Sequence, residues 1–217
     1  APGRITVEEN GLPFVIDLVG GQKTGWFFDH RENRRFAARL ANGLRTVDLY
    51  SYAGGFGLNA AAGGAKSVLF VDRAESALGL AAESAGLQGV AERCEYRRSD
   101  VFAAIDELVA AKERFGLVVA DPPAFVKSKK DLAVGLKGYR KIARGSAALV
   151  TEPGFLCIAC CSHNVSEEAF AAEVYGGIRQ AGRGARLLHR AGAGPDHPIH
   201  PALPESAYLK FLVYALD

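Results

Sequence analysis

The sequence contains no methionine and begins at Ala1. Because translation starts at a methionine, we expect a chain that was processed or cut at its N-terminus, with a preceding domain that this sequence does not include. No uninterrupted apolar run approaches the roughly 18 to 20 residues of a membrane span. The first residues also lack the shape of a signal peptide. The sequence therefore predicts a protein without a membrane segment.

Cysteine is scarce as well, with only Cys94, Cys157, Cys160 and Cys161. Most of them lie within apolar strands and none shows paired spacing across loops, which excludes a disulfide framework and favours reduced thiols in the cytoplasm. Cys157 and Cys160 have the spacing of half a redox or zinc motif, but no second pair occurs elsewhere.

Metal-ligand patterns are missing too. His163, His197 and His200 could suggest a metal site, but no third acid or thiol follows at ligand spacing. We therefore predict that no metal is bound.

Neither sign of charge is in large excess, since 26 Lys and Arg face 24 Asp and Glu. Any contact with a nucleic acid must therefore come from a local patch. Two such patches exist, and each can be a solvated helix face or a surface that contacts phosphates. They consist of Arg31, Arg34, Arg35 and Arg39, and of Lys127, Lys129, Lys130, Lys137, Arg140, Lys141 and Arg144.

From about residue 45 onward, apolar strands alternate with helical patterns. This alternation predicts a single α/β domain with a mostly parallel, doubly wound sheet and helices on both faces. The expected strands are 45–49, 67–71, 94–98, 116–120, 154–160, 185–189 and 207–215. The expected helices are 55–63, 74–86, 101–114, 136–151 and 166–181.

The last two strands are separated only by a loop rich in Gly, Pro and His at 191–206, without a helical pattern. They should therefore pair antiparallel. By fold-level analogy, an antiparallel last strand favours the class I methyltransferase version of the Rossmann-like sheet over a dehydrogenase sheet.

The N-terminal residues follow another pattern. Short strands around turns are expected within 5–28, including one at Gly25–Phe28, and the Asn10-Gly11 pair is a hairpin signal. A helix is expected over 29–41, with Asp29 as its N-cap. We therefore divide the chain into a small β appendage with a connecting helix, 1–41, and a catalytic domain, 42–217.

Acids recur where the strands end. Asp48, Asp72, Asp100 and Asp121 each follow a predicted strand, and glycines fill the first strand-to-helix turn. Each acid alone could merely cap a helix, but together at one sheet edge they favour a bound nucleoside cofactor. The expected cofactor-contacting residues are Asp48, Tyr52, Gly54, Gly55, Phe56, Asp72, Arg73, Asp100, Val101, Asp121 and Pro122.

S-adenosylmethionine fits this pattern best. The first turn does not match the G-x-G-x-x-G of NAD or FAD sites, and no G-K-[ST] of a P-loop is present. One acid can bind the ribose, another can lie near the adenine, and the glycines can lie beside the methionine portion.

The two central strands end in reactive groups. Phe115–Ala120 leads into Asp121-Pro122-Pro123, and the strand before Cys161 would lie next to it. Because parallel strands end at the same sheet edge, we expect the acid and the thiol to lie close together.

Several motifs together resemble the bacterial 23S rRNA cytosine-C5 methyltransferases of class I, from about residue 7 onward. They are Asn10–Phe14, Gly21–Phe27, Asp29 with Arg31–Arg34, Asp48–Gly57, Asp121–Phe125, Cys161-Ser162 and Tyr208–Lys210. The resemblance implies S-adenosylmethionine, an rRNA substrate and a cysteine nucleophile. It also implies that Lys23, Thr24, Gly25 and Arg31 lie over the cofactor pocket. The family's usual N-terminal RNA-binding PUA domain is absent from this sequence, and Cys160 stands where a serine is common.

A thiol has a chemical role in such a reaction. Carbon 5 of cytosine is a poor nucleophile until a thiolate adds to carbon 6. We assign this role to Cys161 and assign binding of the base to Asp121. Cys161 could instead be a small buried hydrophobic residue. The rival functions are N-methylation of an exocyclic amine, which needs no thiol, and RNA binding without catalysis. The expected partner is 23S rRNA, and a homodimer is compatible with the sequence.

Overall fold

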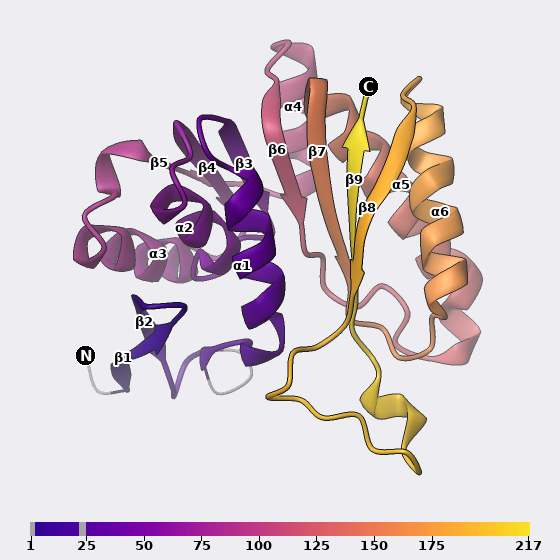
Figure 1. The fold of residues 1–217 in the computed structure, drawn as a ribbon, viewed down its shortest axis with the longest axis horizontal. Helices are drawn as coiled ribbons and strands as arrows, with labels where there is room; N and C mark the ends of the chain where they lie inside the picture. The colour runs from indigo at the N-terminus through magenta and orange to yellow at the C-terminus, as the bar shows by residue number, and fades with distance from the viewer. Residues whose placement is uncertain (1–2, 22–24) are drawn as a thin grey trace.

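The computed structural model describes residues 3–21 and 25–217, and its centre is one seven-stranded sheet (Figure 1). In chain order its strands are β3 (Arg45–Leu49), β4 (Ser67–Asp72), β5 (Cys94–Arg98), β6 (Phe115–Ala120), β7 (Val150–Cys160), β8 (Ala185–Ala191) and β9 (Lys210–Leu216). They lie side by side in the order β5-β4-β3-β6-β7-β9-β8. Strand β9 pairs antiparallel with both β7 and β8, while the other pairs are parallel. The predicted doubly wound sheet with an antiparallel last strand is confirmed.

Helices cover both faces of the sheet. They are α1 (Arg31–Leu40), α2 (Gly55–Ala62), α3 (Glu75–Leu87), α4 (Val101–Ala110), α5 (Leu132–Leu149) and α6 (Glu167–Gln180). Side chains of α1, α2 and α3 form one apolar core, and side chains of α4, α5 and α6 form the other. Successive residues of β6 alternate between the two cores, with Leu117 and Val119 in the first and Val118 and Ala120 in the second. Both faces are buried, which explains the uninterrupted apolar run of this strand.

The N-terminal hairpin consists of β1 (Arg4–Glu9) and β2 (Leu12–Asp17). Asn10 and Gly11 connect the strands with φ values of 55° and 77°, as a tight hairpin turn requires. The prediction of a third strand at Gly25–Phe28 is wrong, because these residues form no strand. Trp26 instead packs on Phe14 of β2, with ring centroids 4.6 Å apart. The division at residue 41 stays a prediction.

Three differences from the sequence-based expectation have local causes. Helix α5 starts at Leu132 because Ser128 and Asp131 form a capping box just before it. His30, and not Asp29, is the N-cap residue of α1, and it makes no side-chain cap hydrogen bond. Strand β9 starts only at Lys210, and Tyr208 before it donates a hydrogen bond to Asp29. Among the described residues, no helix is both long and apolar enough to cross a membrane.

Candidate active site

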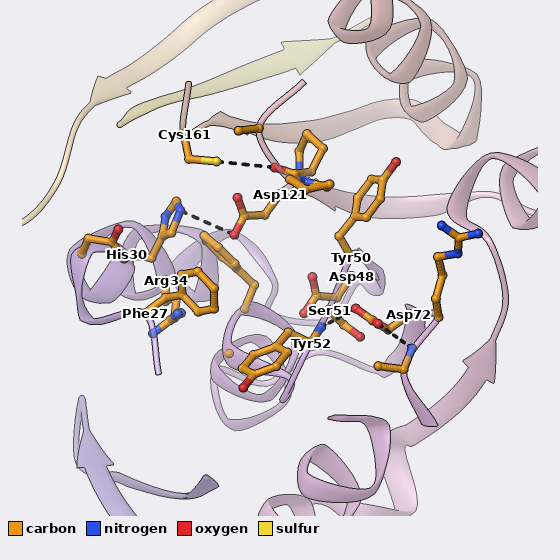
Figure 2. A pocket seen from close by; sticks show the side chains of 18 of the residues that line it. Phe27, His30, Arg34, Asp48, Tyr50, Ser51, Tyr52, Asp72, Asp121 and Cys161 are labelled. Carbon is orange, nitrogen blue, oxygen red and sulfur yellow. Dashed lines mark hydrogen bonds and ion pairs between the residues drawn. The ribbon is translucent and has the colours of Figure 1, made fainter. Parts of the chain in front are cut away.

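A cavity of about 650 Å³ opens at the carboxyl ends of β3, β4 and β6 (Figure 2). Strand β3 lies between β4 and β6, and the helices that follow β3 and β6 lie on opposite faces of the sheet. Open α/β sheets bind their ligands at this switch point. The cavity is lined by Trp26, Phe27, Asp29, His30, Arg34, Asp48, Tyr50, Ser51, Tyr52, Gly55, Phe56, Asp72, Arg73, Ala74, Asp100, Phe102, Asp121, Pro122, Pro123, Ala124, Phe125 and Cys161.

The turn after β3 has an unusual backbone. Tyr50 and Tyr52 have φ values of 63° and 49°, a left-handed conformation that costs energy for residues other than glycine. Gly54, with φ 81°, ends the turn, and a Cβ there would lie 2.9 Å from that of Ala81. This conformation brings both tyrosines and Ser51 to the cavity wall (Figure 2). Sequence analysis missed Tyr50 and Ser51, although their place between Asp48 and the glycines was a signal.

Asp48 lies at the floor of the cavity and is only 1% exposed. Its Oδ2 accepts a hydrogen bond from the Gly57 amide at 2.8 Å. Its Oδ1 is buried and has no hydrogen-bond partner among the described residues. Burial raises the pKa of Asp48 to about 7, with a further contribution from the charge of Asp121, while the Gly57 amide opposes the shift.

Asp72 and Asp100 lie further along the same edge. The Asp72 carboxylate accepts hydrogen bonds from the backbone amides of Tyr52 and Ala74, at 2.8 and 2.9 Å. These bonds hold the turn after β3 in place. Asp100 accepts two backbone amides of α4 and is the N-cap of that helix. Asp100 therefore caps a helix, as each strand-end acid could, and it also lines the cavity.

Asp121 and Cys161 lie at the other end of the cavity, after the neighbouring strands β6 and β7. Asp121 is about one quarter exposed, and the Cys161 thiol lies 3.9 Å from the carbonyl oxygen of Pro122. Cys160 is fully buried among core side chains on the α4 to α6 face. Adjacent residues of an extended chain face opposite ways, so Cys161 is the thiol that lines the cavity (Figure 2).

A second cavity, of about 760 Å³, shares five lining residues with the first, among them Cys161. Its lining residues are Trp26, Phe27, Phe28, Asp29, Ala124, Cys161, His163, His197, Glu205 and Tyr208. The Tyr208 hydroxyl donates a hydrogen bond to Asp29. Behind Cys161, the Lys210 ammonium donates to the carbonyl oxygens of Ser162 and Tyr208, and burial lowers the pKa of Lys210. Because Cys161 lines both cavities, its thiol lies at their junction.

The structure brings most of the expected residues together. Among the predicted residues, those that line the first cavity are Asp48, Tyr52, Gly55, Phe56, Asp72, Arg73, Asp100, Asp121, Pro122 and Cys161. Gly54 and Val101 flank the cavity in sequence without lining it. Arg31, expected over the cofactor pocket, does not line this cavity and forms an ion pair with Asp196 at 2.7 Å. Gly25 accepts a 3.5 Å hydrogen bond from Tyr52, and Lys23 and Thr24 lie outside the described residues.

Sequence analysis also missed two buried residues of the wall. His30 is 2% exposed, and its Nε2 lies 3.5 Å from Oδ2 of Asp121. Arg34, expected on a solvated or phosphate-binding face, is 4% exposed and paired with Glu9. No local sequence pattern distinguishes either residue. No group of three His, Cys, Asp or Glu residues in the described part of the chain could hold a metal ion.

Comparisons with known proteins agree with this geometry. A family model described as S-adenosylmethionine-dependent methyltransferase matches residues 4–215. Ribosomal RNA large subunit methyltransferase I of Tolumonas auensis is 38% identical over 214 residues, which are 98% of this chain and 54% of that protein. The protein of the same name from Aeromonas salmonicida is 36% identical over 210 residues, which are 96% and 53% of the two chains. The chain thus spans about half the length of these relatives.

Solved structures show the same fold. SMU.776, solved in complex with SAH, matches with a TM-score of 0.88 at 24% identity, covering 99% of this chain and 56% of that one. A SAM-dependent methyltransferase from Agrobacterium tumefaciens matches with a TM-score of 0.73 at 18% identity, covering 99% and 71%. Together with the match over residues 4–215, these findings lead to one conclusion: the chain belongs to the S-adenosylmethionine-dependent methyltransferase family.

Proposed function

We propose that this chain is the catalytic part of an enzyme that methylates carbon 5 of a cytosine in large-subunit ribosomal RNA, in the cytoplasm, through a cysteine adduct. The observation that carries the proposal is the position of Cys161. Its thiol lies at the junction of two cavities, near Asp121. The first cavity has the acids expected for a nucleoside cofactor, and the second has aromatic walls. The names of the relatives support ribosomal RNA as the substrate.

The residues of the first cavity fit S-adenosylmethionine. Its volume of about 650 Å³ lies within the range of small-molecule sites. The buried Oδ1 of Asp48 and the buried hydroxyl of Ser51 have no hydrogen-bond partner among the described residues, so a ligand can satisfy both. Asp72 would hold the ribose and Asp100 would lie near the adenine. When bound, the cofactor supplies an electrophilic methyl group on a sulfonium.

The second cavity suits an unpaired base. Phe28 is 42% exposed, and Tyr208 and His197 lie edge to face with ring centroids 6.1 Å apart. Unstacked bases bind on aromatic faces of this kind. A cytosine that stacks on the aromatic wall of this cavity would lie beside Cys161, which lines the same cavity.

The residues divide the chemistry among them. The Cys161 thiolate would form a bond to carbon 6, and a hydrogen bond from the cytosine amino group to Asp121 would orient the ring for this addition. Carbon 5 would then be nucleophilic enough to accept a methyl group from the bound cofactor, with cleavage of the bond between that methyl group and the sulfonium, which would leave as a neutral thioether. Loss of the carbon-5 proton, to His163 or to water, breaks the bond to carbon 6 and restores the thiolate. Lys210 holds the Ser162 carbonyl and thereby fixes the backbone beside the thiol.

Replacing each thiol tests the mechanism. Cys161→Ala should abolish methyl transfer to large-subunit rRNA, because no adduct can form, and should leave cofactor affinity within about two-fold by calorimetry. Cys160→Ser is the matched control and should retain most activity, because its side chain faces the core.

RNA that contains 5-fluorocytosine gives the sharper readout, because its fluorine cannot leave as a proton. The wild-type protein and Cys160→Ser should form an adduct that survives denaturation, and peptide mapping should locate it at Cys161. An adduct at Cys160 would reverse the assignment. Methylation that survives loss of both thiols would favour transfer to an exocyclic amine, and absence of any transfer would leave only RNA binding.

A further inference from the structure

His30 lies between the cavity and the first turn of α1 and is buried between aromatic rings. Its ring centroid is 5.2 Å from that of Phe56 and 6.2 Å from that of Phe211, both edge to face. One ring nitrogen, Nδ1, lies 3.2 Å from the amide nitrogen of Asn33. The other, Nε2, lies 3.5 Å from Oδ2 of Asp121 (Figure 2). The imidazole thus connects a buried amide to an acid of the site.

The orientation of the Asn33 amide is determined by a second contact. Its nitrogen also donates to the carbonyl oxygen of Gly192 at 3.1 Å, and a carbonyl oxygen can only accept. Asn33 is 1% exposed, so an amide rotated the other way could not replace these contacts with hydrogen bonds to water. The two hydrogens of this amide are therefore directed at Gly192 and at Nδ1 of His30.

This arrangement determines the tautomer of the histidine. Because Asn33 donates to Nδ1, that nitrogen must present its lone pair, and the hydrogen of the neutral ring must be on Nε2. The Nε2 hydrogen then faces Asp121. At 3.5 Å the contact is long for a hydrogen bond, and the hydrogen of the buried imidazole attracts the carboxylate.

We propose that His30 is a positioning residue for the methyl-transfer site: held as the Nε2-H tautomer by Asn33, it fixes Oδ2 of Asp121 and leaves Oδ1 to bind the base. The role of Asp121 rests on the proposed function, whereas the tautomer does not. Orientation of this kind affects the rate because the hydrogen bond to the base must form at one angle and distance.

Nitrogen NMR of the 15N-histidine-labelled protein measures the tautomer without any substrate. The chain has five histidines, so the His30 signal is assigned by its absence from the spectrum of His30→Gln. We expect a protonated Nε2 and a bare Nδ1 at neutral pH. A protonated Nδ1, in the other tautomer or in an imidazolium, would overturn the inference. This result stands apart from catalysis, so it separates failure of the inference from failure of the proposed function.

Kinetics with large-subunit rRNA tests the effect on Asp121. His30→Leu fills the same apolar space without a donor, so kcat should fall roughly 10- to 100-fold, with cofactor affinity and thermal unfolding close to wild type. His30→Gln restores an N–H donor and should recover kcat to within about five-fold. His189→Gln, on β8, is the matched histidine control and should not change kcat.

Changing Asn33 tests the origin of the tautomer. In Asn33→Asp the carboxylate can only accept, so a hydrogen should appear on Nδ1 in the nitrogen spectrum. Asn42→Asp adds the same charge at an exposed site just beyond α1 and should change neither the spectrum nor kcat. Equal kcat in His30→Leu and wild type would show that His30 only fills space. Loss of activity in His30→Gln, with its fold intact, would also contradict the proposal.

Discussion

Asp48 shows how a single buried carboxyl can link the site to stability. Its side chain is enclosed by the turn after β3, and the Gly57 amide is the donor that it binds. The folded protein retains the proton on this group up to about pH 7, whereas the unfolded chain releases it near the usual value of 3.8. The folded state therefore binds more protons between these two values. Stability is lost as the pH rises through this interval.

Asp48→Asn should remove this pH dependence, because the amide keeps an oxygen for Gly57 and cannot ionise. Relative to the variant, the wild type should lose about 2 to 3 kcal/mol of unfolding free energy between pH 5 and pH 8. Urea unfolding at the two pH values measures this difference. Asp106→Asn, at an exposed position of α4, is the control and should show no such change. If the unfolding free energies of wild type and Asp48→Asn changed with pH by the same amount, burial would not be holding a proton on Asp48.

Residues with a local signature were predictable, and residues defined by distant partners were not. Asp48, Asp72 and Asp121 could be identified because each follows an apolar strand. Asp29 was misread as a helix cap because its partner, Tyr208, is 179 positions away in the sequence. The role of His30 likewise depends on a distant residue, Asp121, which follows β6.

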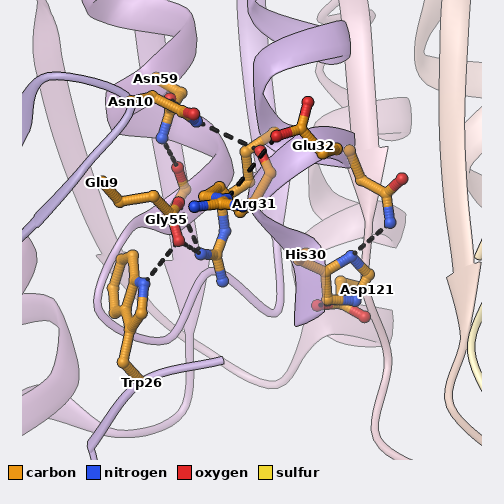
Figure 3. A network of polar contacts seen from close by, with 11 residues as sticks. Glu9, Asn10, Trp26, His30, Arg31, Glu32, Gly55, Asn59 and Asp121 are labelled. Atoms are coloured by element: carbon orange, nitrogen blue, oxygen red, sulfur yellow. Dashed lines mark hydrogen bonds and ion pairs between the residues drawn. The ribbon is translucent and has the colours of Figure 1, made fainter. Parts of the chain in front are cut away.

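At the scale of elements, a buried ion pair joins the hairpin to α1 (Figure 3). Both oxygens of Glu9 accept from Arg34, at 2.8 and 2.9 Å, and one also accepts from the indole of Trp26. The Arg34 guanidinium stacks over the Trp26 ring, 4.4 Å from its centroid. Since Trp26 and Arg34 also line the first cavity, this cluster holds part of the cavity wall.

Glu9→Ala should destabilise the protein by about 3 to 5 kcal/mol, because it leaves the Arg34 charge buried without its partner. Chemical denaturation at constant pH measures the loss. Glu83→Ala breaks the exposed pair between Arg4 and Glu83 and should cost less than about 1 kcal/mol. Equal losses of unfolding free energy in the two variants would show that the buried ion pair contributes no more to stability than the exposed one.

Elements were predictable where periodicity defines them, and their ends were not. Strand β6 was expected to within one residue because both its faces are buried. Residues 150–153 were assigned in part to a helix, yet β7 begins at Val150, directly after α5. The aromatic run at Gly25–Phe28 suggests a strand by composition, but these residues pack on distant partners, such as Phe14 against Trp26.

Across the whole molecule, the two basic patches have different accessibility. In the first, Arg34 is buried and Arg31 is paired with Asp196, which leaves Arg35 and Arg39 exposed. In the second, Lys127, Lys129 and Lys130 are exposed, just beyond the Pro122–Ala124 stretch that lines the first cavity. The net charge of +2 gives no general attraction for RNA. We therefore expect phosphate contacts from the second patch.

Lys129→Glu and Lys130→Glu should each weaken RNA binding at low salt. For every phosphate that a variant no longer binds, the slope of log affinity against log salt should become shallower by about 0.7 to 0.9. Fluorescence titrations at several salt concentrations measure this slope. Lys66→Glu lies just before β4, at the opposite edge of the sheet, and should leave the slope unchanged. If all three variants keep the wild-type slope, the second patch is only a solvated surface.

Under the proposed mechanism, the position of Cys161 at the junction of two cavities restricts the shape of the RNA that can react there. Addition to carbon 6 requires approach perpendicular to the plane of the base, and in a helix that face is covered by the neighbouring bases. A base-paired cytosine exposes only its edges in the grooves. The reactive nucleotide must therefore rotate out of its stack or start from an unpaired loop. A hairpin RNA with the target cytosine in its loop should thus react faster than the same cytosine held in a stem.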